Sequence, residues 1–155
     1  MENLDDIDIQ ILALLQEDGR MTNADVATRV GLSPSAALAR MRKLNETGVI
    51  KGFAAILDED KVGQPTTAYV FITLTHHRRK LAESFLAKVR ALPAIMECYH
   101  ITGKADYLLR VVCKDIPDYR SLLMDHIVAM PEVESVETMF VLRTEKRDLR
   151  LPLGK

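Results

Sequence analysis

The chain has 155 residues, of which 48% are hydrophobic and 28% charged, and its formal net charge is −1. This composition is typical of a soluble globular protein with one domain or two small ones. Every apolar run is shorter than the about 20 residues that a bilayer-spanning helix needs. The acidic N-terminus is unlike a signal or transit peptide, and Cys98 and Cys113 match no metal-ligand spacing. We therefore expect a cytoplasmic protein with reduced thiols, no metal and no membrane contact.

The two halves of the chain differ in charge. Residues 1–63 hold seven Lys and Arg against eleven Asp and Glu, whereas residues 64–155 hold fourteen against eleven. The first half therefore lacks a general attraction to nucleic acid. Any DNA contact there must depend on a local basic cluster.

The first half predicts three short helices. The first starts near Asp5 or Asp6 and ends at Gly19, with apolar residues at helical spacing between them. The second starts at Thr22, which together with Asp25 resembles a capping box. A glycine turn and a third helix follow.

The third helix has clear start and stop signals. Gly31 suits the tight turn before it, and Ser33 followed by Pro34 provides an N-cap and a proline in the first turn. The helix is predicted over residues 34–46. Residues 49–57 then predict a strand or wing, and the polar residues 58–65 a linker.

The second half predicts a ferredoxin-like domain. Strand-like and amphipathic helical segments alternate in the order βαββαβ, over residues 66–75, 78–92, 95–102, 107–114, 117–130 and 133–143. This order makes the whole chain an α+β protein.

The first strand of this domain is apolar on both sides. Val70, Ile72 and Leu74 alternate with Tyr69 and Phe71. Both helices of such a fold cover the same face of the sheet, so a second apolar face indicates contact with another subunit. We predict an oligomer interface at Tyr69, Val70, Phe71 and Ile72. The alternative is a central strand whose far face is covered by the linker.

The third helix is the candidate DNA-binding helix. Small residues on its outward side allow close approach to base edges, and its Arg and Lys residues reach guanine or phosphate. Backbone amides at the start of the second helix also suit a phosphate. The predicted residues are Thr22, Asn23, Ser35, Ala36, Ala39, Arg40, Arg42 and Lys43. A solvated amphipathic helix with ordinary caps is the alternative.

Residues 103–106 form the second candidate site. Gly103 permits backbone conformations that are closed to other residues. Free amides beside a carboxylate suit a zwitterion, because the amides bind its carboxylate and Asp106 binds its ammonium group. An ordinary hairpin turn is the alternative. The sequence has no phosphate loop, nucleophile elbow or HExxH motif, so we predict no catalytic residue and no cofactor.

Three segments together resemble one protein family. They are LDDIDIQILALLQEDGR, NADVATRVGLSPSAALARMRKLNETGVIKGF, and ECYHITGKADYLLRVV with the later PEVESVETMFVL. With them the chain resembles the Lrp/AsnC, or feast/famine, transcription regulators over nearly its whole length. The resemblance implies a winged helix-turn-helix domain over residues 1–50, a β-linker over 51–65, and a ferredoxin-like effector-binding and oligomerisation domain over 66–155.

The resemblance also implies site residues and partners. Ser33, Pro34 and Ser35 match the start of the recognition helix, and Arg40, Arg42 and Lys43 match its basic positions. Family effectors, usually amino acids, bind between dimers near the loop that here spans residues 102–107. The implied effector-binding residues are His100, Thr102, Gly103 and Asp106. Lys104 and Ala105 stand where many members have an acidic residue followed by an aromatic or other side chain.

We therefore predict a cytoplasmic, sequence-specific DNA-binding regulator and not an enzyme. Its expected partners are double-stranded DNA, an amino-acid effector, and further copies of the chain as a dimer or an octamer of four dimers. The alternative is a small-molecule-sensing module whose helix-turn-helix contacts protein. An enzyme is disfavoured because Asp106 and Lys104 lie near no organised nucleophile or metal site.

Overall fold

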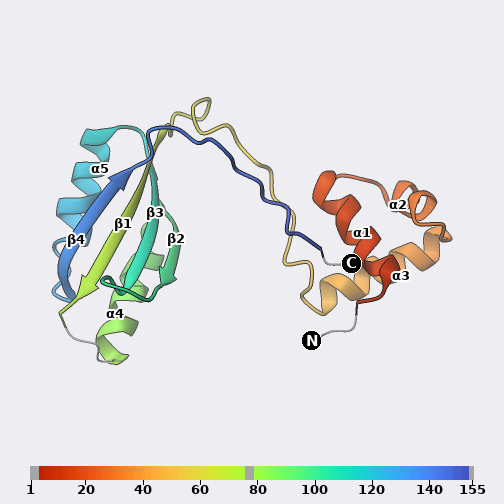
Figure 1. The fold of residues 1–155 in the computed structure, drawn as a ribbon, viewed down its shortest axis with the longest axis horizontal. Helices are drawn as coiled ribbons and strands as arrows, with labels where there is room; N and C mark the ends of the chain where they lie inside the picture. The colour runs from red at the N-terminus through yellow and green to blue at the C-terminus, as the bar shows by residue number, and fades with distance from the viewer. Residues whose placement is uncertain (1–3, 76–78, 154–155) are drawn as a thin grey trace. The chain divides into compact units, whose positions relative to one another are not determined.

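The computed structural model describes residues 4–75 and 79–153 (Figure 1). The chain divides into two compact units. Residues 1–56 together with 146–155 form the helical unit, and residues 57–145 form the sheet unit. Among the described helices, none has the length and apolar character needed to cross a membrane.

The helical unit contains three helices that start where capping residues predict. They are α1 (Asp6–Glu17), α2 (Asn23–Arg29) and α3 (Pro34–Glu46). The side chains of Asp5, Thr22 and Ser33 each accept a hydrogen bond from a backbone N–H of the first turn that follows. These bonds satisfy amides that the helix itself leaves unpaired, so local sequence fixes where each helix begins.

The helix-turn-helix has a small apolar core. Its buried members are Ile11, Leu12, Leu15, Val26 and Leu44. Gly31 lies between α2 and α3 with a φ of 69°, in the left-handed region that favours glycine. The turn directs α3 away from α2, so that Leu44 reaches the core while the opposite side of α3 faces solvent.

The sheet unit has the predicted βαββαβ order. Its elements are β1 (Thr66–Leu74), α4 (Arg79–Arg90), β2 (Ile95–His100), β3 (Tyr107–Cys113), α5 (Ile116–Leu122) and β4 (Val133–Phe140). The strands form an antiparallel sheet in the order β2-β3-β1-β4. Both helices lie on one face of this sheet (Figure 1). The α+β, ferredoxin-like prediction is confirmed.

The two faces of β1 have different surroundings. Val70 and Ile72 are fully buried, together with Phe85 of α4 and Ile127, in the core under the helices. Placing Val70 and Ile72 in an oligomer interface was therefore wrong, because this unit's own core already covers them. Tyr69, with an exposed fraction of 36%, and the half-buried Phe71 lie on the other, open face.

The segment after α3 differs from the prediction. Residues 49–57, all of which are described, form no strand. A strand needs a hydrogen-bonding partner along its length, and this segment has no strand partner within the described chain. Val49 and Ile50 pack against the core of the helical unit. Three later apolar side chains are exposed, with fractions of 55% for Phe53, 74% for Ile56 and 63% for Leu57.

The C-terminal residues also belong elsewhere than expected. Residues 146–155 group with the helical unit, whereas the predicted third domain extended from 66 to 155.

The helix predicted over residues 117–130 is divided into two parts. It ends as α5 at Leu122 and continues as a π-helical turn over Leu123–Ile127. A π-turn holds more residues than an α-turn. Tyr119 and Ile127 are both buried in the core.

Candidate functional site

The outward side of α3 has the character that base contact requires. Ser35, Ala39, Arg42 and Lys43 are exposed, and Ala36 near the start of the helix is half-buried. Pro34 occupies the first turn, and the Ser33 hydroxyl accepts from the Ala36 N–H at 3.2 Å. Small side chains near the start of the helix and cations further along it match the predicted arrangement.

Arg40 has partners within the protein. Its Nη1 lies 2.6 Å from Asp5 Oδ2 and 2.8 Å from Asp8 Oδ1, and the Asp8 side chain is only 11% exposed. The N–H of Asp8 and then the Arg40 guanidinium hold the pKa of Asp5 below its usual value. Arg40 therefore ties α3 to the start of α1, a role that the sequence prediction did not include.

The start of α2 is a self-contained cap. The Thr22 hydroxyl donates to Asp25 Oδ2 at 2.6 Å and accepts from the Asp25 N–H at 3.2 Å. Asn23 beside it is exposed. The Thr22 side chain thus makes the hydrogen bonds of an N-cap. The phosphate contact at Thr22 and Asn23 stays a prediction.

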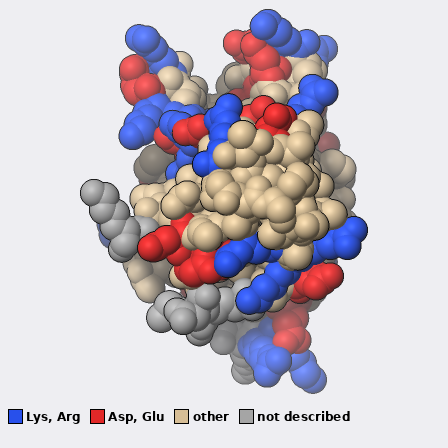
Figure 2. All heavy atoms as spheres, turned by 90° about the vertical axis from the view of Figure 1, so that its right-hand side faces the viewer, with Lys and Arg blue, Asp and Glu red and all other residues tan. Residues whose placement is uncertain are grey.

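The surface of the helical unit carries charges of both signs. Figure 2 shows Lys and Arg side chains interspersed with Asp and Glu around a broad neutral area. This agrees with the charge count of the first half. A contact with DNA depends on particular side chains here, not on a uniformly positive face.

The predicted effector loop is tied to the end of β1. Asp106 Oδ2 accepts a hydrogen bond from the Leu74 N–H at 2.8 Å. The Asp106 N–H donates to Ile72 O at 2.9 Å, and the Asp106 carbonyl accepts from the Ile101 N–H at 2.9 Å. Asp106 therefore positions the loop in addition to any contact with a ligand. Gly103, at the exposed tip, has a φ of 121°.

Two further predicted ligand residues lie beside this loop. His100 at the end of β2 stacks on Tyr107 at the start of β3, with ring centroids 5.1 Å apart and an interplanar angle of 27°. Burial raises the pKa of the Tyr107 hydroxyl. Thr102 is exposed. The structure thus brings His100, Thr102, Gly103 and Asp106 to one end of the sheet.

Sequence reasoning missed a charged network on the open face of the sheet. Arg110 of β3 lies opposite Tyr69 of β1 in the strand register, and the Arg110 side chain is only 10% exposed. Arg110 Nη2 lies 2.7 Å from Glu59 Oε1, and Nη1 lies 3.8 Å from Glu97 Oε1. The Tyr99 hydroxyl donates to Glu97 at 3.1 Å, which raises the pKa of Tyr99. The alternation of β3 already places Arg110 outward, but its partners are distant in sequence.

Neither cysteine belongs to a candidate metal centre. Within residues 4–75 and 79–153, no group of three His, Cys, Asp or Glu side chains is suited to hold a metal ion. Cys98 is half-buried and Cys113 buried. Burial raises the pKa of both thiols, which keeps them protonated and unreactive.

Comparison with known proteins gives two family matches. Residues 67–151 match the model of the Lrp/AsnC ligand binding domain, and residues 4–51 match a winged helix-turn-helix DNA-binding model. A curated relative, the transcriptional regulator AzlB of Bacillus subtilis, is 41% identical over 152 residues, which cover 98% of this chain and 97% of the relative. The leucine-responsive regulatory protein of Escherichia coli is 37% identical over 150 residues, covering 97% and 92%.

Solved structures agree over nearly the full length. A transcriptional regulator of Neisseria meningitidis in complex with L-Met matches with a TM-score of 0.93 and 34% identity, covering 98% of both chains. Escherichia coli AsnC matches with a TM-score of 0.86 and 28% identity, covering 94% of this chain and 96% of AsnC. Both units of the present chain are therefore included in the similarity.

Proposed function

The chain belongs to the Lrp/AsnC family of transcriptional regulators, and we propose a separate function for each of three parts of the molecule. α3 contacts operator DNA, the open face of the sheet joins two copies, and an amino acid bound near residues 102–106 changes the DNA affinity. The protein acts in the cytoplasm, on the DNA, and not as an enzyme.

The outward side of α3 is the main support for the DNA contact. Among the described residues, neither Arg42 nor Lys43 has an acidic partner within ion-pair distance. Arg40 is instead held by Asp5 and Asp8. Arg42 and Lys43 therefore bind phosphate or guanine, while Arg40 sets the position of the helix that presents them.

A second copy of the chain is the proposed partner on the open face of the sheet. Tyr69, Tyr99 and Met139 are exposed there, with fractions of 36%, 50% and 52%. Such a cluster of large side chains is suited to the core of an interface, with the paired Arg110 adding a polar element. A two-fold axis then relates two α3 helices, which bind half-sites about 10 base pairs apart. Four such dimers form the octamer that the family resemblance implies.

An amino acid is the proposed effector. The Neisseria relative was solved with L-Met, and the loop at residues 102–106 combines an exposed glycine with the carboxylate of Asp106. Such an effector acts by binding one assembly or DNA-binding geometry more tightly than another.

Substitution of both cations tests the DNA contact. Arg42→Ala with Lys43→Ala should lower affinity for DNA from the protein's own promoter region by about tenfold or more. It should also lower the slope of log affinity against log salt by about 1 for each phosphate that is no longer bound. Lys80→Ala in α4 is the matched exposed control. Unchanged affinity and slope in the double variant would contradict the proposal.

A protein-binding role for the helix-turn-helix predicts a different result. In that case the unaltered protein gives no specific retardation of upstream DNA in a gel shift at moderate salt. Specific retardation that disappears on the Arg42 and Lys43 substitutions supports the DNA contact and rejects this alternative.

Thermal unfolding across the twenty amino acids tests the effector. A ligand that binds only the folded protein raises the midpoint as its concentration increases. His100→Ala is the preferred variant, because Asp106 also holds the end of β1 through the Leu74 N–H. The variant should abolish the shift. If none of the amino acids raises the midpoint of the unaltered protein, the effector class is wrong.

A further inference from the structure

The C-terminal tail, residues 146–153, is docked on α1 of the helical unit. The Gln16 side chain bonds both backbone groups of Leu151: its Nε2 donates to Leu151 O at 3.2 Å, and the Leu151 N–H donates to its Oε1 at 2.6 Å. Leu153 packs against the core that contains Ile11 and Leu15. Two hydrogen bonds and one apolar side chain therefore fasten the end of the chain to the first helix.

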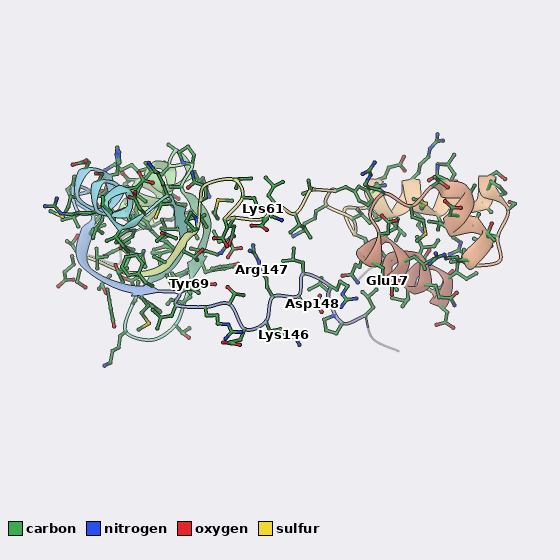
Figure 3. The ribbon with its side chains drawn as sticks, turned by 90° about the horizontal axis from the view of Figure 1, so that it is seen from above. Glu17, Lys61, Tyr69, Lys146, Arg147 and Asp148 are labelled. Atoms are coloured by element: carbon green, nitrogen blue, oxygen red, sulfur yellow. The ribbon has the colours of Figure 1, made fainter. Side chains whose placement is uncertain are left out.

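An ion pair orders the tail just before these contacts. Arg150 Nε and Nη2 lie 3.0 and 3.1 Å from the two carboxylate oxygens of Asp148. Hydrogen bonding to Asp148 raises the pKa of Arg150, and the charge of Glu17 adds a smaller increase. Figure 3 labels Glu17 at the end of α1, and Lys146, Arg147 and Asp148 along the tail. The tail therefore lies close enough to α1 for Glu17 to act on Arg150.

The helix that carries the tail also carries α3. Arg40 of α3 lies 2.6 Å from Asp5 Oδ2 and 2.8 Å from Asp8 Oδ1, at the N-cap and in the first turn of α1. Gln16 lies in the last turn of the same helix, about 16 Å further along its axis. The tail and α3 are thus fastened to opposite ends of one helix, so α1 links the position of one to the position of the other.

The tail is also a second covalent connection between the two units. The chain enters the sheet unit at residue 57 and leaves it after residue 145, and residues 146–155 belong to the helical unit again. At the sheet end, the Val141 N–H donates to Thr67 O of β1 at 2.9 Å. The segment from Val141 to Leu151 spans at most about 35 Å when fully extended. Domains joined by one flexible segment move relative to each other, and a second short attachment restricts that movement.

The docking of the tail depends on few contacts. A cavity of about 410 Å³ is lined by Gln16, Glu17, Ile56 and residues 147–150. Leu149 and Leu151 are exposed, with fractions of 58% and 71%. Since packing between the tail and α1 is incomplete, Gln16 and Leu153 contribute a large share of the attachment. A substitution at either position should release the tail.

We propose that the docked tail determines which operator spacing the protein accepts. It restricts the helical unit, and α3 with it, so that the two α3 helices of a dimer keep one separation. Gln16 and Leu153 are positioning residues that contact no DNA themselves. The proposal rests on the DNA-binding function and the dimer proposed above. Such a dimer binds two half-sites at one spacing and rejects the same half-sites at another, because only one α3 can then enter its major groove.

Operator spacing tests the proposal. The probe is DNA from the protein's own promoter region, with or without two base pairs inserted at the centre of the footprint. The insertion separates the half-sites by about 7 Å more and rotates them by about 70°. The unaltered protein should prefer the original DNA by about tenfold or more. Gln16→Leu removes both hydrogen bonds to Leu151 without changing charge, and it should lower this preference to about threefold or less.

The apolar anchor of the tail provides a matched set of variants. Leu153→Asp should lower the spacing preference as Gln16→Leu does, whereas Leu153→Met keeps an apolar side chain and should retain it. Leu142→Asp makes the same change at a position that is 97% exposed, and it should leave the preference unaltered. Binding is measured below the unfolding midpoint of each variant. A tail that only stabilises the helical unit would lower affinity for both DNAs by the same factor.

The outcomes separate this inference from the function on which it rests. The inference is wrong if the unaltered protein binds both DNAs equally, or if Gln16→Leu retains the preference or weakens both complexes by the same factor. A loss of preference in Leu142→Asp also overturns it, because that residue is no part of the docking. In each of these cases the DNA-binding function stands. Normal operator binding by Arg42→Ala with Lys43→Ala would instead remove the proposed function.

Discussion

In the helical unit a small apolar core is supplemented by polar ties at its edge, whereas in the sheet unit a broad core lies between four strands and two helices. The ties of the helical unit are the Arg40 ion pairs and the Gln16–Leu151 hydrogen bonds. In the sheet unit Phe85, Val70 and Ile72 are buried completely.

This difference matters for DNA binding. The element proposed to contact DNA, α3, is positioned by ion pairs of partly exposed groups, which respond to salt and to nearby phosphate. The element proposed to bind the effector and a second copy is supported by apolar packing, which salt affects far less. The stability of the helical unit should therefore depend more strongly on salt concentration than that of the sheet unit.

Truncation of Phe85, the largest fully buried side chain among the described residues, should have the greatest effect. Phe85→Ala leaves a cavity under the sheet and should destabilise the sheet unit by about 3–5 kcal/mol. All four tyrosines lie in this unit, so tyrosine fluorescence during denaturant unfolding follows it selectively. A tyrosine transition at the midpoint of the unaltered protein would contradict the predicted contribution of Phe85 to the core of the sheet unit.

Truncation in the smaller core should act on the other unit. Leu44→Ala removes a buried side chain of α3 and should cost about 3 kcal/mol in the helical unit. Operator binding should be lost at temperatures where the tyrosine signal is still native. Leu38→Ala, at a half-buried position of the same helix, is the control and should cost less. Simultaneous loss of both signals would contradict separate cores.

An ion pair between the buried Glu132 and the partly exposed Lys88 gives the sheet unit its own pH dependence. Lys88 Nζ lies 2.8 Å from both carboxylate oxygens of Glu132, and the Ser84 hydroxyl donates at 2.6 Å. The Lys88 ammonium, followed by the Ser84 hydroxyl, lowers the pKa of Glu132. The stabilisation is therefore present above the ordinary glutamate pKa of about 4.3 and is lost as pH falls through the lower, folded-state value.

Glu132→Gln measures that contribution. Because the Lys88 side chain is 41% exposed, solvent screening limits the expected cost to about 1–2 kcal/mol near neutral pH. The difference from the unaltered protein should shrink as pH falls below about 4. Urea unfolding across this pH range checks the prediction, and a difference that stays constant with pH would reject the ion pair as its source.

The smallest effect is expected at the exposed edge of the helical unit. Arg40→Gln should lower the unfolding midpoint of this unit modestly, and more at low salt than at high salt, because it removes ion pairs. It should leave the salt slope of DNA binding unchanged. Arg42→Gln should instead leave the unfolding midpoint unchanged and lower the salt slope of DNA binding. If Arg40→Gln lowers the salt slope as Arg42→Gln does, Arg40 binds DNA directly.

The sequence predicted what depends on neighbouring residues. Asp5, Thr22 and Ser33 marked the helix starts, because an N-cap bonds within its own first turn. The alternation in β1 showed two apolar faces, and the order of segments indicated the ferredoxin-like arrangement. The sequence did not show which face of β1 is covered, so Val70 and Ile72 were assigned to an interface although they lie in the core.

Only the tertiary structure decided which distant groups meet. Arg40 bonds Asp5 across 35 positions of sequence, Asp106 bonds Leu74 across 32, and Leu151 bonds Gln16 across 135. Helical or strand periodicity indicates the face of an element on which a residue lies, but not which other element packs against that face. The sequence by itself therefore determined the family, the order of the elements and the starts of the first three helices, but not the conformation of residues 49–57. The packing of those elements decided that Arg40 holds α3 against the start of α1 and that Asp106 binds the end of β1. It also placed residues 146–153 in the helical unit.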